Sequence, residues 1–481
     1  MKPSTNMFIA KMRVSGFKSV PYKISLEVQP RKRVSLNAQL QITLSFLILI
    51  SLPTCVFPQG GNVVSQNQNG APGVYVIRNA RIVTVSGPVI ENGTLVIRDG
   101  KIEKVGTNVS VPTDAIEIDA HGLSVYPGMM DLGTSMGLVE IGSGAPGTVD
   151  TAETGDMNPN AQAIIGLNPH SAHISVTRVS GVTTVLSLPT RNIISGQAAL
   201  INLRGSTSTE MAVVSSAGLA INFPRVSTSS FDALFNQQEI NISDAIKTRD
   251  AQLEQLRKIL KDALAYGVAR DAYIRDNALP RPKESVVLSA LVPFARGERP
   301  VILRVNRETD IRAALRFAKE MHLRPIILGG NDAWKVADLL KQHDIPVIVT
   351  GVWDLPPNDD DFYDVLFENA AKLHKAGVSF CISSGDSGAH VRDLPVQAGM
   401  AAAFGLPQDE ALKSVTLYPA QIMNVADRMG SIEIGKIANL VITDGDLLEA
   451  RTHVRYLFIE GRLMPLVSRH TELYDQFKDR K

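Results

Sequence analysis

The feature that most constrains the fold is a series of short apolar strands in the middle of the chain, separated by helical patterns. The strands are rich in β-branched residues and read VILRV (301–305), PIILG (325–329), PVIVTG (346–351) and SFCISS (379–384). Helices are expected between them, two of them at 332–342 and 362–376 and one with a single apolar face formed by Ile311, Ala314, Leu315 and Ala318. Apolar strands that recur every ~20–30 residues with helices between them indicate parallel βα units, covered on both faces of the sheet. Together with GVTTVLSL (181–188), this pattern predicts an α/β fold, a (β/α)8 barrel of the TIM type.

The two ends of the chain follow a different period, because apolar and polar residues alternate there. VYVIRNARIVTV (74–85) and TLVIRDGKIEKVG (94–106) have this alternation, and Asp99-Gly100 is a strong signal for a two-residue hairpin. Near the other end, NLVITDGDLLE (439–449) and VRYLFIEGRLM (454–464) are again short strands. We therefore expect a small β-sandwich completed by both chain ends, with the barrel inserted into it. The expected boundaries are 73–126 and 431–465 for the sandwich, 127–430 for the barrel and 466–481 for a C-terminal tail.

The first 72 residues have the character of a targeting segment and a linker. The apolar run ITLSFLILISLP (42–53) follows three basic residues at 31–33, and it is short for a membrane span. Basic residues followed by an apolar run predict a secretion signal over 1–60, with a polar linker at 61–72 and export to the periplasm or the extracellular space. Because LPTC (52–55) is similar to a lipoprotein cleavage box, anchoring through a lipid on Cys55 stays open.

Charge and cysteine content exclude several classes of protein. The 49 basic and 48 acidic residues give a formal net charge of +1, which offers no electrostatic footprint for nucleic acid or an anionic membrane. Two cysteines cannot form a framework of disulfides, and Cys381 within an apolar strand is expected in the core. The charged stretch 231–276 predicts a helical insertion, either a solvated helix beside the barrel or a lid over its site.

Four stretches of the sequence resemble the amidohydrolase superfamily, and most closely its imidazolonepropionase-like secreted members. They are RNARIVTVSGPVIENGTLVIRDGKIEKVG (78–106), IDAHGLSVYPGMMDLG (118–133), GVTTVLSLP with ISGQAALI nearby (181–201), and TLYPAQIMNVADRMGSIEIGKIANLVITDGDLL (416–448). The resemblance implies a TIM barrel flanked by a small β-sandwich. It also implies hydrolysis of C–N bonds in small cyclic or linear amides, assisted by one or two divalent ions, commonly zinc.

The same resemblance implies where the metal ligands would lie. The family carries a His-x-His pair on the first strand, one histidine on each of two middle strands, and an aspartate on the last strand that also acts as general base. Here the first pair falls on Gly133 and Ser135, and the middle positions fall on 304–306 and on Gly329. Only Asp386 keeps the chemistry of its position, and one carboxylate cannot supply the three or four donors that zinc needs. No metal ligand is therefore predicted, and zinc enters only through the family.

The resulting site hypothesis is a barrel mouth without its metal centre. Asp386 is the candidate catalytic residue, and the candidate substrate-binding residues are Arg304, Asn306, His390, Gly133, Ser135 and Gly329. A buried Arg304 needs a carboxylate partner, for which Asp386 is the candidate, and such a pair could replace the positive charge of the metal. Asp131 is expected to hold a strand–loop corner. The pair His170 and His173 either begins a helix or joins His390 and Asp386 in a relocated metal or acid/base site.

Three functions remain open at this point. The chain could be an active hydrolase that uses unusual ligands or metal-free catalysis by Asp386. It could instead be a non-catalytic exported protein that binds a small molecule in the barrel mouth or pairs with an active paralogue, or a scaffold without a ligand. Members of the family often form dimers, so a homodimer also stays open for this chain.

Overall fold

The computed structural model describes residues 69–142, 145–227 and 241–480. The predicted signal, Cys55, most of the predicted linker and the first part of the predicted insertion lie outside the described residues. Linker residue Ala71 is described, and it forms a β-bridge with Leu463 near the other end of the chain.

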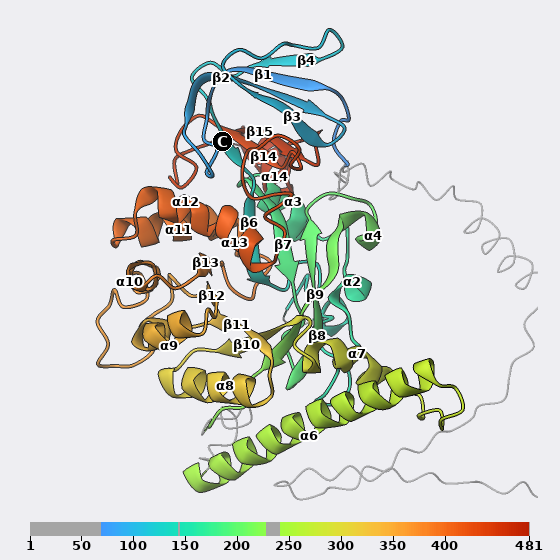
Figure 1. Ribbon diagram of the computed structural model, residues 1–481. Helices are drawn as coiled ribbons and strands as arrows, with labels where there is room; N and C mark the ends of the chain where they lie inside the picture. The colour runs from blue at the N-terminus through green and yellow to red at the C-terminus, as the bar shows by residue number, and fades with distance from the viewer. Residues whose placement is uncertain (1–68, 143–144, 228–240, 481) are drawn as a thin grey trace, which may run out of the picture. The chain divides into compact units, whose positions relative to one another are not determined.

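Eight strands form the barrel sheet, in which neighbours in sequence are neighbours in space. They are β6 (Met129–Thr134), β7 (Val182–Ser187), β8 (Ile194–Asn202), β9 (Ala212–Asn222), β10 (Pro300–Val305), β11 (Arg324–Gly329), β12 (Val347–Val349) and β13 (Phe380–Ile382). These strands, with helices around them, confirm the predicted TIM-type barrel (Figure 1). One strand differs from the (β/α)8 pattern, because β8 runs antiparallel to both β7 and β9. The connections on either side of β8 are too short for the crossover helix that parallel strands require.

Helices cover the barrel sheet, and the later ones follow the expected βα order. The described helices before β10 are η1 (Pro146–Thr148), α2 (Ala163–Gly166), α3 (Ala172–Arg178), α4 (Ser208–Met211), α6 (Ile242–Arg275) and α7 (Val286–Ala295). Those after β10 are α8 (Glu308–Glu320), η2 (Ala333–Val336), α9 (Ala337–Gln342), α10 (Asn369–Ala376), η3 (Val391–Asp393), α11 (Leu394–Ala403), α12 (Gln408–Ser414), α13 (Leu417–Ile422) and α14 (Arg469–Phe477).

Two predicted helices differ in their bounds from the observed ones. The helix expected at 332–342 is a 3-10 turn followed by the short helix α9. The helix expected at 362–376 begins only at Asn369. Phe362 and Tyr363 suggested an earlier start, but they are 82% and 71% exposed and form no buried helical face.

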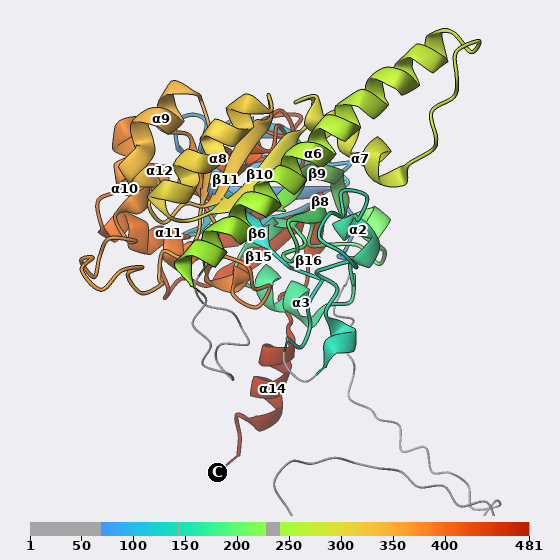
Figure 2. The same cartoon turned by 90° about the horizontal axis from the view of Figure 1, so that it is seen from below.

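The predicted helical insertion is the 34-residue helix α6, as far as it is described. Its buried residues Leu256, Leu260, Ala263 and Gly267 follow helical spacing, and α6 lies beside α7 and α8 on the outside of the barrel (Figure 2). Arg257 joins it to α8 through an ion pair with Glu320. Within the described part of the insertion, Ile242–Arg275, no residue lines the cavity at the barrel mouth, as expected of a solvated helix beside the barrel.

A second sheet combines strands from both ends of the chain. Its members are β1 (Tyr75–Ile82), β2 (Ile90–Arg98), β3 (Lys101–Gly106), β4 (Ile116–Asp119), β5 (Ser124–Pro127), β14 (Leu440–Thr443), β15 (Val454–Ile459) and β16 (Arg462–Met464). The path runs β16-β15-β14-β5-β1-β2-β3, and β4 pairs with β1. Antiparallel pairing of β14 with β5 joins the two ends, which confirms the predicted sheet domain (Figure 1). Asp99 and Gly100 adopt φ of 50° and 78° between β2 and β3, as the hairpin signal requires.

Candidate ligand site at the barrel mouth

The first and last strands of the barrel meet through side chains. Asp131 on β6 is fully buried, and it accepts hydrogen bonds from Ser383 Oγ at 2.5 Å and from both the backbone N–H and the Oγ of Ser384, which follow β13. The Gly133 N–H is a fourth donor, at 3.2 Å. We call Asp131, Ser383 and Ser384 the closing seam, because no β-ladder joins β13 to β6 in the described part of the chain. Asp131 is therefore structural, as expected.

Burial changes the acid–base chemistry of two groups in this part of the barrel. Removal from water raises the pKa of Asp131, and the hydrogen bonds from the two serines oppose this shift only in part. Burial, together with the nearby Asp131 carboxylate, raises the pKa of the Cys381 thiol well above its ordinary value. Cys381 is a buried core residue, as predicted, and its neutral thiol is no nucleophile.

Gly133 and Ser135, two predicted ligand-binding positions, serve the scaffold. A Cβ added to Gly133 would overlap Ser383 Oγ and lie 3.2 Å from Leu328 Cδ1, so the closing seam fills the space of a larger side chain. The Ser135 hydroxyl and N–H both donate to the backbone carbonyl of Asp386, at 2.7 and 2.8 Å. Neither residue lines the cavity at the barrel mouth. Ser135 instead fixes the loop that carries Asp386.

A cavity of about 350 Å³ lies at the carboxyl ends of β10 to β13, and we call it the mouth cavity. Five of the seven predicted site residues line it: Arg304, Asn306, Gly329, Asp386 and His390. Ligand sites of TIM barrels occupy this end of the strands. The structure thus brings these five predicted site residues together around one cavity.

Arg304 and Asp386 form the ion pair that the sequence predicted. The Asp386 side chain is 57% exposed, whereas that of Arg304 is 23% exposed, so the guanidinium lies deeper in the mouth. The Nη2 atom of Arg304 and the Oδ1 atom of Asn306 are buried without a hydrogen-bond partner among the described residues. Gly329 has φ of 105°, and a Cβ there would overlap Asn306 Oδ1. Asn306 therefore fills the space that a side chain at position 329 would need.

The donors at the mouth do not fit the zinc centre that the family resemblance implies. Asp354, Asp386 and His390 line the mouth cavity, yet within the described ranges no three His, Cys, Asp or Glu residues are arranged to hold a metal ion. Asp386 is already paired with Arg304, whose positive charge opposes a second cation beside it.

The histidine pair is explained by the local fold. His173 lies in the first turn of α3, where Ser171 is the N-cap, and its Nε2 is 3.3 Å from the backbone oxygen of Glu140. The His170 N–H donates to Asn168 Oδ1 in the preceding turn. Of the two histidine alternatives, the start of a helix is confirmed. His390, at the start of η3, lines the mouth cavity without them.

Several lining residues were missed by the sequence reasoning. They are Asn331, Thr350, Gly351, Asp354, Ser384, Gly385 and Ser387. Each follows β11, β12 or β13 by a few residues, so the signal was available in the strand pattern. Taking every residue just beyond each parallel strand would have found them, because these ends converge on one face of a barrel.

The fold and the mouth cavity define a TIM-barrel protein with a cavity at the end where such barrels bind ligands and a side sheet built from both chain ends. Comparison with known proteins agrees, since the family described as "Amidohydrolase family" matches residues 310–464. The solved amidohydrolase from Thermotoga maritima is 26% identical with a TM-score of 0.73, covering 81% of this chain and 99% of that one.

Two curated relatives extend the comparison. Amidohydrolase tasK of Hapsidospora irregularis is 26% identical over 77% of this chain, which spans only 39% of that longer protein. The imidazolonepropionase of Mesorhizobium japonicum is 25% identical over 78% of this chain and 93% of its own length. The chain is thus similar to amidohydrolases in the sequence of residues 310–464 and in its fold.

Proposed function

We propose that the mouth cavity binds a small molecule through an amide group, and that it does so without the zinc centre of the family. The observation that carries this proposal is the pair of unpartnered buried atoms, Arg304 Nη2 and Asn306 Oδ1, at residues that line the same cavity. One is a donor and the other is an acceptor. An amide presents a carbonyl oxygen to the first and an N–H to the second.

Arg304 Nη2 and Asn306 Oδ1 lack the hydrogen bonds that they would form in water. Both atoms are buried, and a buried polar atom without a partner costs about 1–3 kcal/mol. A ligand recovers that cost when the side chains of Arg304 and Asn306 turn toward it on binding. A cavity of about 350 Å³ is at the lower end of the range for ligand sites, which favours a small molecule. Asp386 keeps the Arg304 side chain oriented before the ligand arrives.

Similarity to amidohydrolases supports hydrolysis of a non-peptide C–N bond as the reaction class. The ion pair at the mouth favours one route that uses this chain's own residues. Arg304 would bind the carbonyl oxygen while Asp386 takes a proton from the attacking water and passes it to the leaving nitrogen. The water oxygen then forms the new bond to carbon as the C–N bond breaks. Binding without turnover is the conclusion that we favour, and metal-free hydrolysis is the second candidate.

Export belongs to the same proposal, on the basis of the apolar segment at 42–53 and its basic flank. In the part of the chain that the structure describes, none of the helices has the length and apolar character of a membrane span. N-terminal sequencing of protein recovered from a secreting host would test export, because an uncleaved start at Met1 contradicts it.

Metal analysis tests the metal-free part of the proposal. The full chain is expressed with zinc or manganese in the medium, purified without chelator and analysed by mass spectrometry for bound metal. We expect substoichiometric metal. The metal-free site would be overturned if one ion per chain stayed bound through purification. A chelator should then remove both this ion and ligand binding.

Calorimetric titration tests whether the mouth cavity recognises an amide group. The two probes are a small cyclic imide and a cyclic ketone of the same ring size that has no nitrogen. We expect the imide to bind more tightly, and Asn306→Ala to remove at least about tenfold of that affinity, or 1.4 kcal/mol. Asn331→Ala, which changes another asparagine of the same cavity, is the control and should change the affinity less. Equal binding of both compounds would contradict the proposal. Imide turnover that Asp386→Ala abolishes would establish the hydrolytic candidate instead.

A further inference from the structure

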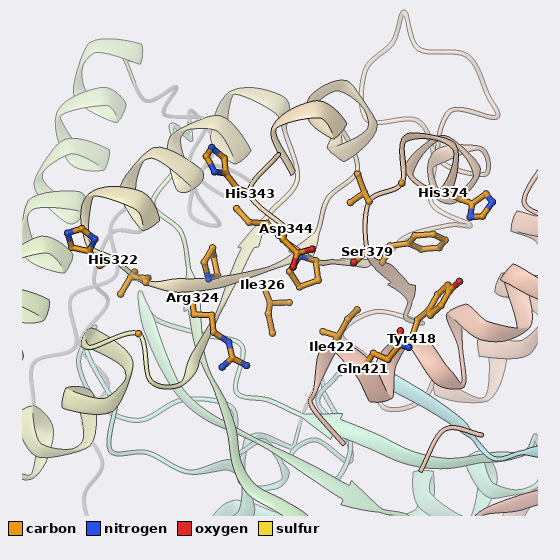
Figure 3. Close-up of a pocket in the computed structure, with 18 of the residues that line it drawn as sticks. His322, Arg324, Ile326, His343, Asp344, His374, Ser379, Tyr418, Gln421 and Ile422 are labelled. Atoms are coloured by element: carbon orange, nitrogen blue, oxygen red, sulfur yellow. The ribbon is translucent and has the colours of Figure 1, made fainter. Parts of the chain in front are cut away.

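A second and larger cavity, of about 950 Å³, lies at the opposite ends of the barrel strands (Figure 3). We call it the base cavity, and the lining residues that matter here are Arg324, Ile326, Asp344, Ser379, Gln421 and Ile422. Arg324 is the first residue of β11, whereas Gly329 at the other end of that strand lines the mouth cavity. The five steps between them span about 16 Å, so the two cavities are separate sites.

Two opposite charges at the rim of the base cavity form no ion pair with a residue that the structure describes. Arg324 begins β11 and Asp344 lies three residues before β12, and both side chains are exposed. The two strands are neighbours, paired through Ile327 and Val347, which brings both charges to the same rim. Figure 3 shows Arg324 and Asp344 on different sides of one space.

The other charged groups at the base are already engaged. Arg296 pairs with Asp271 at 2.6 Å. Glu410 accepts a hydrogen bond from the Tyr418 hydroxyl at 2.5 Å and pairs with Lys413 at 2.8 Å. Among the described residues that line the base cavity, Arg324 and Asp344 are thus the charged groups left to meet a ligand. Three histidines, His322, His343 and His374, also line the rim, and His374 Nδ1 lies 3.3 Å from a carboxylate oxygen of Glu410.

Apolar and amide groups complete the lining. Ile326 is buried in the barrel interior and Ile422 is half-buried beside it, and both contribute to the cavity wall. The Phe380 and Tyr418 rings pack edge to face, with centroids 6.1 Å apart, at one side. The Gln421 side chain makes no hydrogen bond with the described residues, and it points toward the same space as Arg324 (Figure 3).

We infer that the base cavity binds a small zwitterion with an apolar side chain, namely a free amino acid or a short unblocked peptide. The guanidinium of Arg324 presents two parallel N–H donors to a carboxylate, and Asp344 accepts from an ammonium group. The isoleucines bury the apolar side chain, and the Gln421 amide pairs with a peptide group. A volume of about 950 Å³ is at the upper end for ligand sites and favours the peptide over the single amino acid.

Calorimetric titration of the full chain with L-leucyl-L-leucine and with L-leucine tests the inference and distinguishes the two sources. Saturable binding of the dipeptide at one site is expected, with N-acetyl-leucyl-leucine and leucyl-leucine amide each at least about tenfold weaker. If L-leucine binds with higher affinity than the dipeptide, the site is assigned to a free amino acid. Equal binding of the blocked peptides, or no saturable binding of either probe, would overturn the inference.

Isosteric variants locate the binding. Arg324→Gln and Asp344→Asn should each weaken dipeptide binding at least about tenfold. Asn tolerates the φ of 50° at position 344, so the second variant keeps the backbone. Arg451→Gln, an exposed arginine outside the cavity, is the matched control. Asn306→Ala should leave dipeptide binding unchanged, and a loss in that variant would place the peptide in the mouth cavity and contradict a base site.

Discussion

Two aspartates at the carboxyl ends of the barrel strands have opposite surroundings. Asp131 is fully buried and accepts four hydrogen bonds, whereas the Asp386 side chain is 57% exposed and is paired with one arginine. The same end of the barrel thus separates two tasks. Asp131 joins the first strand to the last, and Asp386 faces the cavity where a ligand can reach it.

The difference also explains why the mouth cavity excludes the first strand. The closing seam fills the space above Gly133, so the cavity is lined by residues at and beyond the ends of β10 to β13. A barrel that used the first strand for metal binding would need that space for side chains. The polar groups at the mouth of this chain are therefore gathered on one side of the barrel.

The largest expected effect is the loss of the closing seam. Asp131→Ala leaves buried serine and backbone donors without an acceptor, so we expect the free energy of unfolding to fall by about 3–5 kcal/mol. Asp386→Ala is the matched control at the same end of the barrel. Because the ion pair of Asp386 with Arg304 is partly exposed, Asp386→Ala should lower the free energy of unfolding by less than about 1 kcal/mol. Urea unfolding followed by circular dichroism measures both, and equal losses would remove the distinction between the two aspartates.

A smaller effect is expected from a methyl group at Gly133. In Gly133→Ala the new Cβ meets Ser383 Oγ and Leu328, so the closing seam must shift, at a cost of about 1–3 kcal/mol. Gly142 has open space around its added Cβ and no positive φ, and Gly142→Ala should change the stability by less than about 0.5 kcal/mol. A neutral Gly133→Ala would show that the seam is loosely packed.

The smallest effect concerns pH. Because burial raises the pKa of Asp131, the stability that this group contributes is complete below its unfolded pKa near 3.8 and is lost as the pH rises through the folded pKa. Asn at this position does not titrate. The stability of wild type relative to Asp131→Asn should therefore decline with rising pH, by at most about 1.4 kcal/mol per pH unit. Parallel urea-unfolding profiles from about pH 4 to about pH 8 would contradict the raised pKa.

The architecture could be predicted from sequence because it rests on periodicity. Short apolar runs such as 301–305 and 325–329 predict buried strands, and this prediction does not require knowing which residues their side chains contact. Strand β8 escaped this reasoning, because a buried strand reads as apolar whether it runs parallel or antiparallel. The pairing of Arg304 with Asp386 was predictable from the cost of an unpaired buried charge.

The details of the site depended on geometry that one sequence does not contain. Gly133 and Ser135 were placed at the mouth by their position after Asp131, but the contact with Ser383 that fills this space joins residues 250 positions apart (383 minus 133). The partner of Ser135 is likewise a backbone oxygen, which no side-chain pattern can reveal. Residue type predicted the ion pair, and packing decided which positions reach the cavity.

Pairing of β5 with β14 has a consequence for synthesis on the ribosome. Tyr126 pairs with Val441, so 315 residues (441 minus 126) separate the partners in the chain. At about 5–20 residues per second, roughly 16–60 seconds pass after Tyr126 is made before its partner exists. During that interval the edge of β5 has unpaired backbone groups, which attract other strands. The nascent amino-terminal sheet is thus the part of this protein that most needs protection from aggregation until translation ends.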